Sequence, residues 1–186
     1  YDNYGIEEPD LIDIGWLVKA LEGTPDAYND FKAFYETHSP SDPQVFEQYK
    51  QYMDLDNWTF YYIGEIIIGN IDWPQGNRFP VRDRNNPDAK WFWVVYDVDM
   101  SQGMFEGVDN PTLEWSLRDE LREDLRSPDW EQQLWATLLM RRLLENDDYK
   151  RHWLTSFAHM LNTAFSTDEV IPRIDAAASY IESGIP

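Results

Sequence analysis

The segment from Asn57 to Ile68 constrains the fold more than any other part of this 186-residue chain. Its apolar and aromatic side chains occupy most of the circumference of a helix rather than a single stripe. A helix of that kind is buried, with other elements enclosing it on nearly every side. We therefore predict a central helix here, capped by Asp56, with the remaining elements packed around it.

Amphipathic patterns on either side of this segment predict further helices. Apolar residues recur at helical spacing from Leu11 to Leu21, and the pattern stops at Gly23. A second helix is predicted to begin at Thr24-Pro25 and to bury one aromatic stripe. That stripe consists of Tyr28, Phe31, Phe34 and Tyr35. The other predicted helices run from 41 to 53, from 127 to 145, from 146 to 165 and onward from 166, with capping-box starts at Ser41 and Ser166.

The middle of the chain changes from helical to strand-like patterning. Gly69–Asn77 is rich in Gly, Pro and Asn and is predicted to be a loop. Phe79–Arg82 and Trp91–Tyr96 flank a turn at residues 83–89, so together they predict one hairpin. The fold class predicted for the whole chain is mainly α with a small β-hairpin, an α+β fold. We expect residues 1–186 to form a single domain or lobe.

Composition excludes several classes of function. A formal net charge of −20 repels phosphates over most of the surface, so we expect no nucleic-acid partner. The chain has no cysteine and therefore no disulfide, thiolate nucleophile or Cys-ligated metal. Its longest apolar run, Ile66–Ile68, is too short to span a bilayer. The chain begins at Tyr1 rather than Met, so we expect it to be processed or truncated, and the missing leader does not bear on secretion.

Polar residues gather on both sides of the predicted hairpin. Asp72 and Asn77 are five apart, the D-x-x-x-x-N spacing of a protein-kinase catalytic loop. In such a loop the Asp orients the attacking hydroxyl and accepts its proton, while the Asn oxygen binds Mg²⁺. Asp97 follows the second strand, where a kinase places the Asp that binds the metal bridging the nucleotide phosphates. We predict that Asp72, Asn77 and Asp97 converge at the open end of the hairpin.

The spacing by itself leaves other interpretations open. D-x-x-x-x-N arises by chance in acidic chains, and Asp72 and Asn77 would then only shape a turn. Asp97 and Asp99 would likewise only cap a strand end, or they would belong to a calcium site.

A longer set of residues resembles the signature of the CotH (spore coat protein H) kinase family. In that family an N-x-D-W-P-x-x-N loop precedes K-W-x-W and D-x-D. The matching residues here are Asn70, Asp72, Trp73, Pro74, Asn77, Lys90, Trp91, Trp93, Asp97 and Asp99. Upstream, Asp54, Asp56, Asn57 and Tyr61-Tyr62-Ile63 are similar to the helix before the loop, and Leu143–Asn146, Leu161–Ser166 and Ile174-Asp175 are similar to the C-terminal helices. The resemblance extends over roughly residues 24 to 183.

The resemblance implies a divergent protein-kinase-like C-lobe that binds ATP with Mg²⁺ or Mn²⁺. It implies an atypical protein Ser kinase that modifies secreted or spore-surface proteins, so an extracellular or cell-surface location is expected. Asp72 matches the catalytic Asp, and Asn77 and Asp97 match the residues that hold the metal and nucleotide. Asp99 matches the family's second acidic residue and is a further metal-ligand candidate. The negative charge favours a basic protein substrate.

This sequence also departs from the family pattern. Phe92 replaces a basic residue and Val81 an aromatic one. The family's N-terminal, nucleotide-binding lobe is expected to be missing and to be a partner of this portion. Lys19 is the only early lysine, and it lies in a segment predicted to be helical. A strand lysine for the nucleotide is therefore not expected.

Two other functions remain open. One is a non-catalytic binding or adhesion module that retains the fold. The other is a calcium-stabilised carbohydrate-binding domain, which would consist mostly of strands. Trp91 and Trp93 are predicted to pack in the core, and His38, His152 and His159 to have surface or packing roles. A basic stripe at Arg118, Arg122 and Arg126 is predicted to be a solvated, ion-paired helix face.

Overall fold

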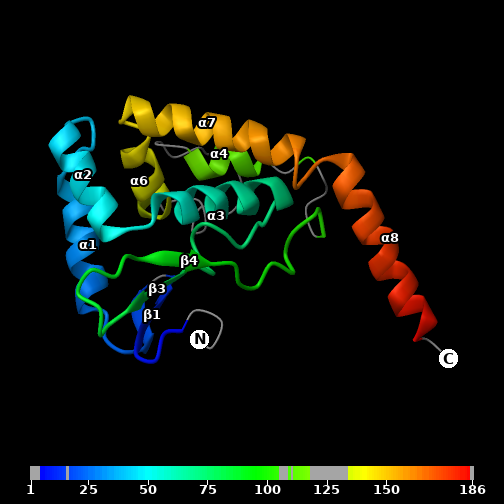
Figure 1. The fold of residues 1–186 in the computed structure, drawn as a ribbon, viewed down its shortest axis with the longest axis horizontal. Coiled ribbons are helices and arrows are strands. Elements are labelled where there is room, and N and C mark those ends of the chain that lie inside the picture. The colour runs from blue at the N-terminus through cyan, green and yellow to red at the C-terminus, as the bar shows by residue number, and fades with distance from the viewer. Residues whose placement is uncertain (1–4, 16, 105–108, 110, 118–133, 185–186) are drawn as a thin grey trace. The chain divides into compact units, whose positions relative to one another are not determined.

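A computed structural model describes residues 5–15, 17–104, 109, 111–117 and 134–184. Over these ranges the chain is mostly helical, with seven helices and one four-stranded antiparallel sheet (Figure 1). The strands are β1 (Pro9–Ile14), β2 (Val18–Glu22), β3 (Phe79–Asp83) and β4 (Phe92–Val94). The helices are α1 (Asp26–Thr37), α2 (Pro43–Tyr52), α3 (Leu55–Ile68), α4 (Thr112–Leu117), α6 (Leu134–Leu143), α7 (Asp147–Asn162) and α8 (Thr167–Ser183). The α+β class predicted from the sequence is confirmed.

The chain divides into two compact units, residues 1–150 and 151–186. The first contains the sheet, α1 to α4 and α6, and α7 crosses the boundary. The second contains the rest of α7 together with α8, which has no buried residue. No helix in the described ranges has the length and apolar character needed to cross a membrane.

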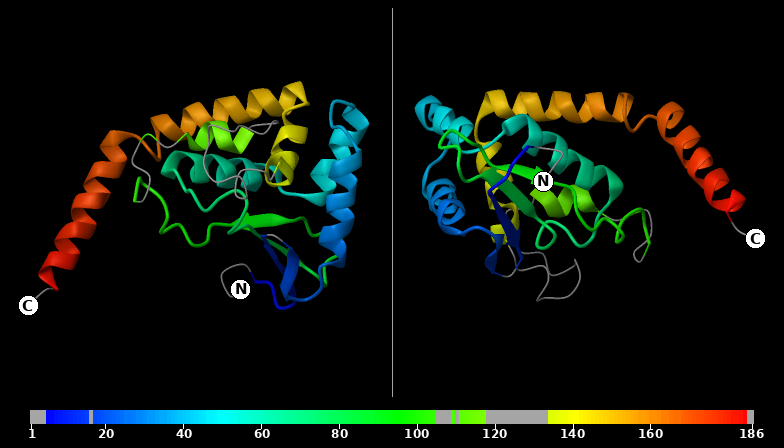
Figure 2. Two further views of the ribbon diagram at one scale, coloured as in Figure 1. Left: turned by 180° about the vertical axis from the view of Figure 1, so that it is seen from behind. Right: turned by 60° about the horizontal axis from the view of Figure 1, so that its bottom comes forward.

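The central helix is confirmed. α3 lies between β4 and α4, and seven of its residues are buried (Figures 1 and 2). Its N-cap is Asp54 rather than Asp56: the Asp54 carboxylate accepts a hydrogen bond from the Asn57 N–H at 2.9 Å. The helix therefore begins at Leu55, because the earlier aspartate already satisfies a free backbone donor of the first turn.

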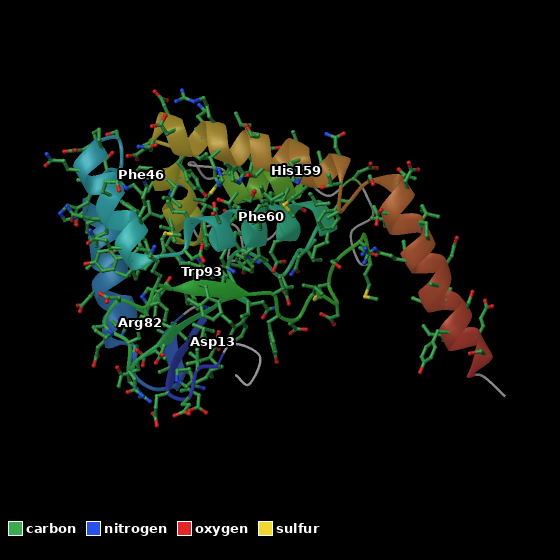
Figure 3. All side chains as sticks on the ribbon, in the orientation of Figure 1. Asp13, Phe46, Phe60, Arg82, Trp93 and His159 are labelled. Carbon is green, nitrogen blue, oxygen red and sulfur yellow. The ribbon has the colours of Figure 1, made fainter. Side chains whose placement is uncertain are left out.

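The predicted hairpin is also confirmed, with Phe79 opposite Val94 and Val81 opposite Phe92. Trp93 packs against Trp58 of α3 with ring centroids 4.5 Å apart (Figure 3). Trp91 packs against Tyr28 of α1 at 5.3 Å. Both tryptophans are therefore core residues, as predicted, and they fix one face of the hairpin against the helices.

The helix predicted from Leu11 to Leu21 is wrong. These residues form β1 and β2, which pair antiparallel through Ile14 and Val18. β1 also pairs with β3, placing Leu11 opposite Val81, so the sheet order is β2-β1-β3-β4. The apolar spacing fits either structure, and pairing with a strand some 70 residues later decides it. Lys19 is consequently on a strand rather than a helix, and its side chain is exposed.

The other helices agree closely with the sequence patterns. All four aromatic residues of the α1 stripe are buried. Asp42 caps α2, and the Asn146 side chain accepts from the Tyr149 N–H at 2.9 Å, at the start of α7. Ser166 precedes α8 but makes no side-chain capping bond. The start predicted for the helix at 127–145, and the stripe at Arg118, Arg122 and Arg126, lie outside the described residues.

Candidate active site

The loop after α3 is a tight turn that places two polar side chains together. α3 ends at Gly69, whose φ of 67° a residue with a side chain adopts less readily. Asn77 closes the loop, also at positive φ, and donates from Nδ2 to the Asp72 Oδ2 at 3.4 Å. A side chain at Gly76 would come within 3.2 Å of the Asp72 carbonyl oxygen. The five-residue spacing therefore brings the predicted catalytic and metal-binding side chains into contact.

The end of β4 supplies the second part of the site. Asp97 follows the strand at φ 54° and is exposed, as is Asp99. Partial desolvation raises the pKa of the Asp97 carboxyl above its ordinary value. A side-chain hydrogen bond with Asp99, and the charges of Asp99 and Asp72, raise this pKa further. The negative charges of the loop and the strand end are therefore close enough to repel one another.

Backbone hydrogen bonds hold the two parts in register. The Ile71 N–H donates to the Met100 carbonyl at 3.0 Å, and the Gln102 N–H donates to the Ile68 carbonyl at 2.8 Å. Asn57 of α3 bonds to β4 in both directions, accepting from the Trp93 N–H at 2.6 Å and donating to the Trp93 carbonyl at 3.1 Å. These two pairs of hydrogen bonds connect α3 and its loop to the residues before and after Asp97. They therefore fix the position of this aspartate from both sides along the chain.

Two buried residues, to which the sequence patterns gave no catalytic or metal-binding role, support the loop. Glu65 is 1% exposed and accepts from Asn70 Nδ2 at 2.9 Å, and Asn70 Oδ1 accepts from the Asp72 N–H at 3.1 Å. Burial raises the pKa of Glu65 to about 7, and the bond from Asn70 opposes this shift. The sequence did contain a signal for Glu65, because it is a carboxylate within an otherwise apolar helix.

Trp73 and Arg78 fill the space on either side of the loop. Trp73 is fully buried and packs edge-on against Tyr62, with ring centroids 4.5 Å apart. Arg78 is 3% exposed, donates to the Ala136 carbonyl at 3.1 Å and stacks over the Trp135 ring at 5.0 Å. The loop that carries Asp72 and Asn77 is thus anchored by large side chains at both ends.

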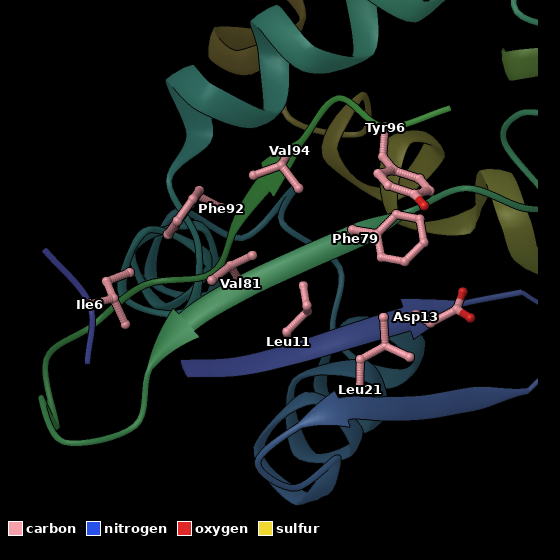
Figure 4. Close-up of a pocket in the computed structure, with 9 residues that line it drawn as sticks. All are labelled: Ile6, Leu11, Asp13, Leu21, Phe79, Val81, Phe92, Val94 and Tyr96. Carbon is pink, nitrogen blue, oxygen red and sulfur yellow. The ribbon is translucent and has the colours of Figure 1, made fainter. Parts of the chain in front are cut away.

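An apolar hollow of about 460 Å³ lies on the face of the sheet opposite the helices (Figure 4). We call it the sheet hollow. Its lining residues are Ile6, Leu11, Asp13, Leu21, Phe79, Val81, Phe92, Val94 and Tyr96. Phe79 and Tyr96 stand together at one end, with ring centroids 4.6 Å apart, and Asp97 is the next residue in the chain. The two departures from the family pattern, Val81 and Phe92, both face this hollow.

Lys19 is close to the same end of the sheet hollow. It pairs with Asp13 across β1 and β2, and it is two residues from Leu21 on β2. Because alternate residues of a strand share one face, Lys19 lies on the face that carries the hollow. The sequence reasoning missed this position because it predicted a helix there.

The acidic residues of the site provide some of the ligands that a divalent cation requires. Within the described part of the chain, no three His, Cys, Asp or Glu side chains are close enough together to hold a metal by themselves. Mg²⁺ in phosphoryl-transfer sites needs only one or two carboxylates, since substrate phosphates and water supply the other ligands. Asp97, Asp99 and the Asn77 amide therefore fit a metal that arrives with a nucleotide.

The histidines have ordinary surroundings. His38 stacks on Phe34 at 4.8 Å, and His152 and His159 are exposed.

Comparison with known protein families decides the classification. The family model described as CotH kinase protein matches residues 15–186. The chain belongs to the CotH kinase family. The resemblance inferred from the loop and strand-end motifs is therefore confirmed, and the match extends over β2, β3, β4 and all the described helices. No curated protein and no solved structure matches the chain.

Proposed function

We propose that this CotH kinase family member is the catalytic-loop lobe of an atypical protein kinase that transfers the γ-phosphate of ATP to Ser residues. The observation that carries the proposal is the contact between Asn77 and Asp72, together with the charge interaction between Asp72 and Asp97. If the loop and the strand end only shaped turns, their aspartates would gain nothing from lying close together, because their negative charges repel each other.

Each residue has a defined role in the proposed reaction. The Asp72 carboxylate orients the Ser hydroxyl and accepts its proton as the oxygen–phosphorus bond forms. The bond between the γ-phosphorus and the β,γ-bridging oxygen breaks, and ADP leaves. Asn77 and Asp97 hold Mg²⁺ or Mn²⁺, with Asp99 as a further ligand. When bound, the metal neutralises charge on the phosphates.

The sheet hollow is the proposed site for the nucleotide base. Its aromatic and aliphatic lining suits a flat, apolar ring, and it ends beside Asp97, where the phosphates would meet the metal. Lys19 supplies a cation on the same face and is the proposed phosphate contact. This arrangement supports the orientation of ATP with its base over β3 and β4 and its phosphates toward Asp72.

The charge of the chain supports a class of protein substrate. A net charge of −20 attracts basic segments and increases their encounter rate at low ionic strength. We propose Ser-containing basic segments of secreted or spore-surface proteins as the substrates, in accord with the family.

Transfer of labelled phosphate from ATP to a Ser-rich basic protein tests the proposal. The protein should be assayed together with any residues encoded before Tyr1, in Mg²⁺ and in Mn²⁺. Labelled phosphoserine that depends on the metal is the expected result. Binding of ATP and metal without any transfer would instead support the alternative, a non-catalytic module that retains the fold.

A further inference from the structure

A chain of hydrogen bonds that starts at the buried Glu65 connects α3 to Asp72. Glu65 Oε2 accepts from Asn70 Nδ2 at 2.9 Å, and Asn70 Oδ1 accepts from the Asp72 N–H at 3.1 Å. The backbone adds a parallel bond, from the Asn70 N–H to the Glu65 carbonyl at 3.2 Å. Glu65 is 1% exposed and Asn70 is fully buried, so solvent does not compete for the bond between them, while the bond to Asp72 is part-buried.

The fold itself gains little from a carboxyl group at position 65. Its neighbours along the helix include Tyr61, Tyr62 and Ile66, all buried. Oε1 has no hydrogen-bond partner among the residues that the structure describes. Tyr61 is the titratable group that interacts with the Glu65 charge, and the Arg78 cation acts on the same Tyr61. Burying a polar group that is only half satisfied costs free energy, so apolar side chains at positions 65 and 70 together would serve the core better.

The chemistry of the Asn70 amide explains what the carboxylate contributes. An amide side chain has one donating end and one accepting end. A carboxylate acceptor at position 65 selects the NH₂ end, and the oxygen must then face the Asp72 N–H. If the amide turned round, its NH₂ group would face the backbone N–H of Asp72 and the bond would be lost. Glu65 therefore decides which way Asn70 points.

We propose that Glu65 is a positioning residue, which orients Asn70 so that Asn70 holds the backbone of Asp72 in place. The proposal rests on the proposed function for its catalytic consequence, but its structural part can be measured without any activity. Neither Glu65 nor Asn70 touches the substrate in this account. They act through the position of the Asp72 main chain, and hence of its carboxylate.

Two substitutions separate positioning from packing. Glu65→Gln keeps an acceptor oxygen for Asn70. Glu65→Leu removes the acceptor and fills its place with an apolar side chain. The amide hydrogen exchange of Asp72 is measured by NMR on the 186-residue chain, with Ile71 as the control. The Ile71 N–H bonds to the Met100 carbonyl and not to this chain of side chains.

We expect Asp72 exchange about 10-fold faster in Glu65→Leu, because the hydrogen bond from the Asp72 N–H is weakened or lost. Exchange at Ile71 should be unchanged, and exchange at Asp72 in Glu65→Gln should be close to wild type. In the phosphoryl-transfer assay Glu65→Leu should lower kcat by about 10-fold with KM for ATP unchanged, because Asp72 acts on the hydroxyl and not on the nucleotide.

The possible outcomes separate the two proposals. Faster exchange at Asp72 alone, in a protein whose wild type transfers no phosphate, would support the positioning role and refute the proposed function. Unchanged exchange at Asp72 in Glu65→Leu would overturn the positioning role. Equal acceleration at Asp72 and Ile71 would also overturn it, because Glu65 would then be a packing residue.

Discussion

Asn77 donates a hydrogen bond to the carboxylate of Asp72, five positions earlier in the chain, at 3.4 Å. Among the residues that the structure describes, this contact uses only the NH₂ group of Asn77 and leaves its Oδ1 available for a cation. The same loop is connected through Ile71 and Met100 to the segment that carries Asp97 and Asp99. One short stretch of chain thus gathers an acid–base group and candidate metal ligands, and the following predictions test this arrangement.

Substitution of Asp97 should remove the metal site. With Asp97→Ala, Mn²⁺ in the presence of ATP should bind at least about tenfold more weakly, since a carboxylate ligand and its charge are lost. Titration calorimetry measures the change. Asp88→Ala is the matched control, because Asp88 is an exposed aspartate in the turn between β3 and β4, outside the site. Equal losses in both variants would show that only general surface charge attracts the ion.

Metal binding should also become stronger as the pH rises. The pKa of Asp97 is raised by desolvation and by Asp99 and Asp72, so its carboxyl is protonated over a wider range than an ordinary aspartate. A cation must displace that proton, and binding should release it. We expect affinity for Mn²⁺ to increase from pH 4 upward, with proton release detected in buffers of different ionisation enthalpy. A pH-independent affinity would contradict the assignment.

Glu65 should make the fold less stable as the pH rises. Burial raises its pKa from 4.5 to about 7, so between these values the native state holds a proton that the unfolded state has lost. The free energy of unfolding should therefore fall from about pH 4.5 to about pH 7 and then level off. Over this pH range the free energy of unfolding should fall by roughly 3 kcal/mol. Urea unfolding of wild type and Glu65→Gln measures this, and the difference between their pH profiles isolates the glutamate.

Trp73 should be a major source of stability for the loop. Trp73→Ala removes a fully buried side chain that packs on Tyr62, and such truncations cost about 3–5 kcal/mol. Chemical unfolding followed by circular dichroism measures the loss. Leu17→Ala is the control, because Leu17 is 79% exposed and its removal should change stability by less than about 0.5 kcal/mol. A loss below about 1 kcal/mol for Trp73→Ala would contradict its anchoring role.

Filling the sheet hollow should weaken nucleotide binding. Val94 lines the hollow, whereas its neighbour Val95 does not and is 60% exposed. We expect Val94→Trp to raise the Kd for ATP by roughly tenfold, since forcing a group into filled space costs about 1–3 kcal/mol. Val95→Trp should leave the Kd unchanged. Equal Kd values for both variants, measured by calorimetry, would place the base elsewhere.

Local patterns in the sequence were sufficient for much of the fold. The aromatic stripe of α1 and the apolar circumference of α3 predicted buried faces correctly, because helix periodicity is a property of neighbouring residues. β1 and β2 could not be found in this way. Their apolar spacing is compatible with a helix, and only pairing between Leu11 and Val81 selects strands.

The same distinction between local and long-range information applies to the candidate site. Asp72, Asn77 and Asp97 were selected by their spacing together with the family resemblance, and their roles remain a prediction. The contact between Asn77 and Asp72 was accessible in this way because it depends on the local geometry of a short loop. The orientation of Asn70 by Glu65 was not accessible, since it depends on which end of an amide meets a buried carboxylate. Lys19 was missed for a different reason: its strand is defined by partners far along the chain.

Replacement of Asp72 by Asn tests the central claim most directly. The side-chain volume is nearly unchanged, but the group that accepts the hydroxyl proton is lost, and general-base catalysis contributes about 10²–10⁴-fold. Transfer of labelled phosphate from ATP to a Ser-rich basic protein is compared for wild type, Asp72→Asn and the control Asp88→Asn, with circular dichroism to verify folding. The account predicts a loss of that size for Asp72→Asn only. Activity of Asp72→Asn within a few-fold of wild type would contradict it, because Asn can shape a turn as well as Asp can.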